Sequence, residues 1–134
     1  MNSALLIKIV WAPALVLILH VIATVTGFYE ALWWMDIPAH FLGGCAIVIS
    51  TSYVLDYFHG KGQFSVNWIP LNILILLAFA GMAAAAWEVL EFGLDRYLGT
   101  STQVSLLDTI KDLCMGISGG GLTAIILIIK KQLK

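Results

Sequence analysis

Three pairs of ionisable side chains stand out because the members of each pair are three or four residues apart, and residues at this spacing share one face of a helix. The pairs are Asp36 with His40, Glu88 with Glu91, and Asp108 with Asp112. Carboxylate oxygens with an imidazole nitrogen form a ligand set that suits Mg²⁺, Mn²⁺, Zn²⁺ or Fe²⁺. The spacing therefore predicts a site for one divalent cation, provided that the three pairs meet in the folded chain.

The same side chains suggest a catalytic role. A bound cation can activate water or polarise a phosphoryl oxygen, and Glu88 or Glu91 could then act as the general base. The sequence contains no Gly-rich phosphate loop, Gly-x-Ser-x-Gly motif or His-Glu-x-x-His motif. Catalysis would thus depend on the carboxylates and not on a dedicated nucleophile.

Several converging carboxylates cannot all stay ionised without a counter-charge. A cation is one solution, and protonation of some of the acids is another. A third is pairing with Arg96, Lys111 or a protonated His40. A structural network of ion pairs and hydrogen bonds therefore stays open as an alternative to a metal site.

The composition decides which kind of element must position these residues. Of the 134 residues, 60% are hydrophobic and only 11% are charged, and the mean hydropathy is +0.95. Soluble domains carry about 25% charged residues, and a domain of this size has too much surface to hide so much apolar area from water. We therefore expect an integral membrane protein. The seven basic residues are too few and too scattered for a nucleic-acid surface.

Four apolar stretches are long enough to cross a bilayer, which takes about 20 residues per helix. Their approximate ranges are 5–27, 37–58, 69–92 and 106–129. The links between them are short, which favours antiparallel neighbours. The sequence predicts an all-α polytopic protein, with residues 1–134 forming a single transmembrane domain whose four helices make an up-down bundle.

The basic residues predict the orientation, since Lys and Arg gather on the cytoplasmic side. Most of them fall near the two termini and in the link between the second and third helices: Lys8, Lys61, Lys130, Lys131 and Lys134. Both termini are therefore expected in the cytoplasm. The three ionisable pairs then lie in the outer half of the bundle, at the level of the outer-leaflet headgroups.

Small residues lie about one turn deeper than the pairs, where they would let the helix backbones approach closely. They are Gly43, Gly44, Ala83 to Ala86, Gly116 and Gly119 to Gly121. Three further polar or soft side chains have ordinary interpretations. His20 is expected to be a buried histidine bonded to a carbonyl group, and Cys45 and Cys114 to be apolar core thiols. Glu30 and Asp95 are expected to be solvated residues at the interface.

Three motifs, in order, resemble the YjdF-like family of bacterial inner-membrane proteins and the broader VanZ-like group. They are Asp36-Ile-Pro-Ala-His40-Phe41, Trp87-Glu88-Val-Leu-Glu91-Phe92 and Asp108-Thr-Ile-Lys-Asp112. The chain looks like a short, divergent member, since it reads Val104-Ser105-Leu106-Leu107-Asp108 where that family typically has Gly-Asp-x-Trp-Asp. The resemblance implies an inner-membrane location and supplies no established reaction.

Three functions fit these observations. The first is a metal-dependent enzyme acting on a lipid or a lipid-linked envelope precursor at headgroup level. The second is a proton- or cation-binding transporter, since buried carboxylates with a histidine serve in proton relays. The third is a non-catalytic membrane scaffold whose polar network sets the helix register. The sequence names no protein partner or oligomeric state, so the lipid bilayer is the one partner it predicts.

Overall fold

The computed structural model describes residues 2–133; Met1 and Lys134, the last of the basic residues counted above, lie outside this range. The elements are α1 (Ser3–Val25), α2 (Phe28–Ala31), the 3-10 helix η1 (Trp33–Met35), α3 (Asp36–Gly60), α4 (Ile69–Leu98) and α5 (Leu106–Gln132). No strand occurs between residues 2 and 133. Within that range, four helical segments are long and apolar enough to cross a membrane. The predicted all-α polytopic fold is thereby confirmed.

Local sequence explains where the helices begin and end. The side chains of Asn2 and Ser105 accept hydrogen bonds from backbone amides in the first turns of α1 and α5. Pro70 stands in the first turn of α4, where its missing N–H costs nothing, and α4 stops at Gly99, whose φ of +69° suits glycine. The polar residues after position 92 continue this helix to Leu98. The single-domain organisation of the whole chain stays a prediction.

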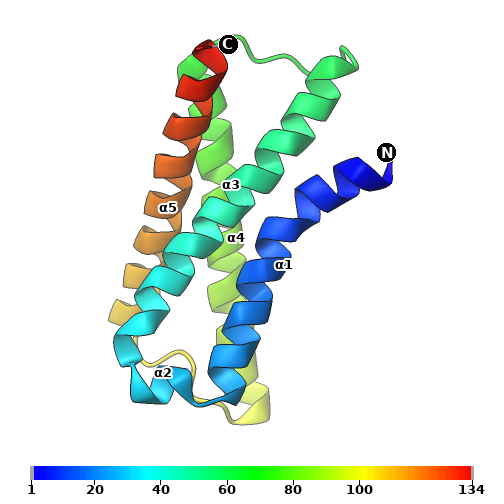
Figure 1. Ribbon diagram of the computed structural model, residues 1–134. Helices are drawn as coiled ribbons and strands as arrows, with labels where there is room; N and C mark the ends of the chain where they lie inside the picture. The colour runs from blue at the N-terminus through cyan, green and yellow to red at the C-terminus, as the bar shows by residue number, and fades with distance from the viewer. Residues whose placement is uncertain (1, 134) are drawn as a thin grey trace.

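The long helices run alternately up and down, and the ends of the chain lie at the same end of the bundle (Figure 1). The largest interface joins α3 to α5, and α4 packs against both of them. The main neighbour of α1 is α3. The short elements α2 and η1 fold across the opposite end of the bundle, between α1 and α3 (Figure 1).

Glycines allow α3 and α5 to touch backbone to backbone. A Cβ atom added to Gly44 would collide with the backbone of Gly116, and one added to Gly119 would collide with the backbone of Phe41. The Cys45 thiol donates a hydrogen bond to the Gly119 carbonyl across this contact, at 3.3 Å. Close packing of small residues is thus present beneath the ionisable pairs, as expected.

The outward surface of the bundle is apolar along its length, as a lipid-facing surface should be. Even α1, the most peripheral of the long helices, has Ala12 as its one buried residue within the described range. Cys114 is also exposed on this surface. The expectation that Cys114 is a core thiol is therefore wrong: its position on α5 faces away from α3 and α4.

Candidate metal centre

Three helices bring the ionisable pairs to one end of the bundle. Asp36 lies in the first turn of α3, with His40 one turn later, and Pro38 suits that first turn because it needs no N–H partner there. Asp112 follows the first turn of α5. Glu88 and Glu91 lie in the C-terminal half of α4. Since α4 ends where α3 and α5 begin, the antiparallel arrangement gathers all of them at the same depth.

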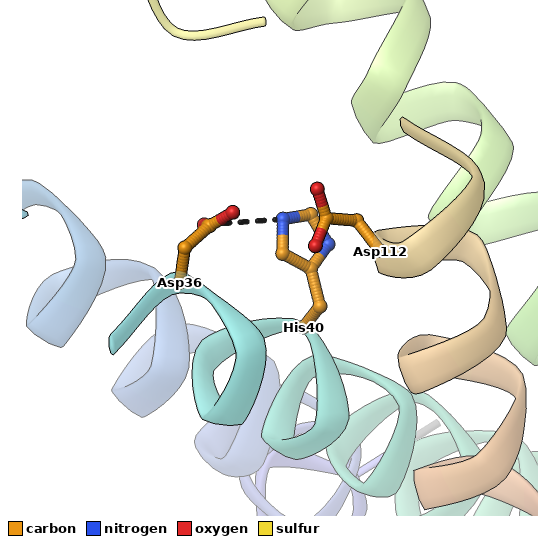
Figure 2. A group of neighbouring side chains, drawn as sticks. All are labelled: Asp36, His40 and Asp112. Atoms are coloured by element: carbon orange, nitrogen blue, oxygen red, sulfur yellow. Dashed lines mark ion pairs between the residues drawn. The ribbon is translucent and has the colours of Figure 1, made fainter. Parts of the chain in front are cut away.

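One group of ligand atoms joins α3 to α5. The Nε2 atom of His40 lies 3.3 Å from Oδ1 of Asp36, and the carboxylate of Asp112 lies beside the imidazole ring (Figure 2). Asp36, His40 and Asp112 each offer one ligand atom, and these atoms all lie within 4.8 Å of one another. This separation is short enough for one cation to bind all three.

A second group joins α3 to α4 through the other nitrogen of the same ring. The Nδ1 atom of His40 lies 3.9 Å from Oε1 of Glu88. His40, Glu88 and Glu91 again offer ligand atoms within 4.8 Å of one another. The two groups share His40, so the five residues form one continuous cluster, here called the carboxylate cluster: Asp36, His40, Glu88, Glu91 and Asp112.

Burial of the carboxylate cluster is unusual for charged side chains. Glu88, Glu91 and Asp112 are 5%, 7% and 2% exposed. Among the described residues, Oε1 of Glu88 and Oδ1 of Asp112 have no hydrogen-bond partner. Buried polar atoms without a partner are rare, because each one costs about 1–3 kcal/mol. These two oxygens lie on separate helices, and the carboxylates that carry them both belong to ligand groups that include His40.

Asp108 stands apart from the carboxylate cluster. Its carboxylate pairs with the Lys111 ammonium group, which also lies 3.7 Å from Oδ1 of Asp112. Lys111 therefore supplies one of the counter-charges considered above, at the rim of the cluster. The i, i+4 spacing predicts Asp108 as a metal ligand together with Asp112, but the structure leaves Asp108 outside both groups of converging ligand atoms. Asp108 lies in the first turn of α5, one turn before Asp112, and is therefore nearer the N-terminal end of that helix.

Trp87 is the residue that the ionisable pattern did not reveal. Its indole Nε1 donates a 2.9 Å hydrogen bond to Oε1 of Glu91. The i, i+4 spacing of Trp87 and Glu91 was the available signal, since it places the indole on the same face as the carboxylate. The hydrogen bond fixes one oxygen of Glu91 and leaves Glu88 as the less constrained carboxylate of α4.

His20 of α1 adds a second layer next to Trp87. Its ring meets the indole edge-on, with the centroids 4.9 Å apart, and its Nδ1 shares a 3.1 Å hydrogen bond with the Tyr29 hydroxyl. The expected carbonyl partner of His20 is therefore wrong. Burial, together with the charges of Asp36 and Glu91, raises the pKa of Tyr29 to about 12, so that this hydroxyl stays protonated at neutral pH.

Asp95 has a structural role in the link between α4 and α5. Its Oδ1 accepts hydrogen bonds from both the backbone amide and the hydroxyl of Thr102, each at 2.8 Å, and its Oδ2 accepts one from the Gln103 amide. Glu30, in contrast, is exposed. Asp95 orders the segment that leads into α5, so it helps to set the position of Asp112.

Over residues 4–132 the chain matches a family described as "Predicted membrane protein (DUF2238)". No curated protein and no solved structure matches it. The family description agrees with the four membrane-crossing segments of the described residues and gives no reaction. It does not carry the YjdF-like or VanZ-like name, which stays a resemblance.

Proposed function

We propose, from the premise that this chain belongs to the DUF2238 family of predicted membrane proteins, that it is a membrane enzyme whose carboxylate cluster binds one divalent cation. The substrate class is a lipid or a lipid-linked envelope precursor. The observation that carries the proposal is the pair of buried oxygens, on Glu88 and Asp112, that have no hydrogen-bond partner among the described residues. The carboxylates of both residues belong to ligand groups that include His40, whose Nε2 already faces Asp36.

The oxygen and nitrogen atoms of the carboxylate cluster are better suited to bind a cation than to form hydrogen bonds with one another. Carboxylate oxygens accept hydrogen bonds and cannot donate them when ionised, so neighbouring carboxylates cannot satisfy one another. A cation among them would supply the missing partner to each. Mg²⁺, Mn²⁺, Zn²⁺ and Fe²⁺ all accept oxygen ligands together with an imidazole nitrogen, and the cluster offers four carboxylates and one histidine.

The two ligand groups define two neighbouring positions for the cation. A cation between α3 and α5 would use Asp36, His40 and Asp112, which leaves Glu88 free as a general base. A cation between α3 and α4 would use Glu88 and Glu91 as ligands instead. We favour the first position, because the Trp87 hydrogen bond already occupies one oxygen of Glu91.

The chemistry follows from this arrangement. A bound divalent cation polarises a phosphoryl oxygen or lowers the pKa of a bound water to about 7. The free Oε1 of Glu88 would accept the proton of the attacking water. Lys111, at the rim, carries the positive charge that could approach an anionic headgroup. Hydrolysis of a phosphate ester in a lipid is the reaction class that uses each of these groups.

The basic residues support a location in a bacterial-type inner membrane with both termini in the cytoplasm. Lys8 lies near the start of α1, Lys61 directly follows α3, and Lys131 lies near the end of α5. These helix ends lie at one end of the bundle (Figure 1), opposite the starts of α3 and α5, where the carboxylate cluster lies. Positive residues gather on the cytoplasmic side of membrane proteins. The carboxylate cluster would then face outer-leaflet headgroups, and the resemblance to inner-membrane proteins points to the same compartment.

A structural network is the competing function, and one observation favours it. A protonated His40 between Asp36 and Glu88 would offset part of the negative charge without any metal. The protein would then be a scaffold whose cluster sets the helix register. Transport has less support, because the carboxylate cluster occupies only one end of the bundle and provides no chain of polar groups across the membrane.

Metal content separates these functions. The protein is purified in detergent without chelator, and bound metals are counted by mass spectrometry in the parent and in the His40→Ala, Asp112→Asn and Glu88→Gln variants. We expect close to one ion per chain in the parent, loss in His40→Ala and Asp112→Asn, and retention in Glu88→Gln. Loss in Glu88→Gln with retention in Asp112→Asn would move the cation to the second position. A metal-free parent would overturn the proposal and favour the scaffold.

A further inference from the structure

A cavity of about 250 Å³ lies directly beside the carboxylate cluster. It is partly open, and all four long helices contribute to its walls. His40, His20 and Trp87 line one end of the cavity, at the level of the cluster, and Pro13, Ile47 and Ala80 line the opposite end. From His40 to Ile47 on α3, and from Ala80 to Trp87 on α4, each wall extends for about 10 Å at about 1.5 Å per residue.

The cavity exists because small residues line it and because α1 leaves space beside α4. More than half of its lining residues are Gly or Ala. The main contact of α1 is with α3, and α1 reaches α4 through the edge-on contact of His20 with Trp87. Pro13 removes a backbone hydrogen bond within α1, and the N-terminal part of that helix diverges from the bundle (Figure 1).

Hydrocarbon is the medium that fits this cavity. Water needs two to four polar partners in a buried site, and here the polar side chains gather at the end beside the cluster. An empty apolar cavity forfeits the dispersion contacts of its walls. The cavity lies among membrane-crossing helices, so lipid chains surround it, and its volume is below the usual 300–1,000 Å³ of whole-ligand pockets. Part of one chain would fill it.

We infer that this cavity holds one hydrocarbon chain of a membrane phospholipid, with the headgroup of that lipid at the carboxylate cluster. The inference rests on the proposed function for the role of that lipid as substrate. The ring of His40 connects the two sites, because it lines the cavity and also lies 3.9 Å from the unpartnered oxygen of Glu88. A chain in the cavity would therefore position a phosphate beside the proposed cation.

The test fills the cavity without touching the ligands. A Cβ atom on Gly43 would meet no heavy atom within 4 Å, so Gly43→Leu extends into open space, and Ala83→Leu fills the same cavity from α4. Ala85→Leu is the matched control, since Ala85 is exposed on the same helix as Ala83. Each protein is reconstituted in vesicles of phosphatidylethanolamine and phosphatidylglycerol. Part of the phosphatidylglycerol carries a photoreactive diazirine in one acyl chain. After illumination, the labelled peptides are mapped by mass spectrometry.

We expect labelling of the cavity-lining segments of α1, α3 and α4 in the parent and in Ala85→Leu, and at least a fivefold decrease in both Gly43→Leu and Ala83→Leu. Labelling that is unchanged in the filled variants, or confined to outward-facing residues, would overturn the inference. Metal content is measured on the same samples. Cavity-specific labelling in a metal-free parent would retain the lipid site and reject the enzyme, whereas metal binding without cavity-specific labelling would do the reverse.

Discussion

The two ends of the helix bundle hold ionisable side chains in opposite ways. At the end where α3 and α5 begin, Glu88, Glu91 and Asp112 are less than 10% exposed, and two of their oxygens lack a hydrogen-bond partner among the described residues. At the other end, Lys131 and Asp56 form an ion pair at 2.5 Å, and their side chains are 48% and 52% exposed. The second pair is solvated, and each of its members has an obvious partner.

This difference distinguishes the buried carboxylate cluster, which calls for a functional explanation, from the exposed Lys131–Asp56 ion pair, which does not. An exposed ion pair contributes about 0–1 kcal/mol to stability, so the Lys131–Asp56 pair needs no further explanation. Buried carboxylates without partners lower stability, by about 1–3 kcal/mol for each unsatisfied atom. Intramembrane ionisable residues are expensive and are usually functional. The contrast between the two ends is therefore the reason to look for a cation at the carboxylate cluster, and three pairs of substitutions and one single substitution test it.

The largest expected effect compares the histidines of the two ends. His40→Ala removes the ligand that both groups share, so we expect metal affinity to fall by at least 100-fold, or about 2.8 kcal/mol at about 1.4 kcal/mol per factor of ten. His59 lies at the C-terminal end of α3, far along the helix from His40. The His59→Ala substitution should therefore leave the metal affinity unchanged. Equilibrium dialysis against Zn²⁺ and Mn²⁺ measures both variants. Equal affinity in the two would remove the distinction between the ends.

The next effect concerns the glycine contact beneath the carboxylate cluster. In Gly44→Ala the new methyl group would collide with the backbone of Gly116, whereas in Gly60→Ala it would meet nothing within 4 Å. Overpacking costs about 1–3 kcal/mol. We therefore expect a lower unfolding temperature in detergent for Gly44→Ala, followed by circular dichroism, and no decrease for Gly60→Ala. A Gly44→Ala protein as stable as the parent would contradict the backbone contact between α3 and α5.

A smaller effect is expected from the tryptophan that supports Glu91. Trp87→Phe keeps an aromatic ring and removes the 2.9 Å hydrogen bond to the carboxylate. Loss of a group that orients a metal site typically costs 10- to 100-fold in metal affinity, and we expect about tenfold, because the cation position we favour does not use Glu91. Trp68→Phe, at an exposed position at the opposite end, is the control in the same dialysis. A decrease larger than that of His40→Ala would favour the second cation position.

The smallest effect belongs to the exposed ion pair. Asp56→Asn should change the free energy of unfolding by at most about 1 kcal/mol and leave metal content at the parent value. Chemical denaturation in mixed micelles and metal analysis of the same sample measure the two quantities. A decrease in metal content on this substitution would show that the two ends of the bundle are coupled and do not hold their ionisable groups independently.

Much of the fold follows from one-dimensional features of the chain. The apolar stretches predict the membrane-crossing helices, because the bilayer thickness sets the number of consecutive apolar residues that a crossing helix needs, and stretches of that length can be recognised in the sequence. The helix ends are less predictable: α4 continues through Asp95 and Arg96 to Leu98, since local helical bonding persists where hydropathy has already fallen. The i, i+4 spacing predicts that Asp36 and His40 interact, which they do at 3.3 Å, because that contact lies within one helix.

Contacts between helices were decided by tertiary structure. The sequence alone named the acids and the histidine, their pairing along each helix and their common depth. Only packing could show that Asp112 joins His40 while Asp108 stays outside both ligand groups, because the rotation of α5 about its axis depends on which residues, such as Gly119, lie against α3. The cavity beside His40 also depends on packing: small side chains and Pro13 make room for it, but its position between α1 and α4 follows from how the helices are arranged.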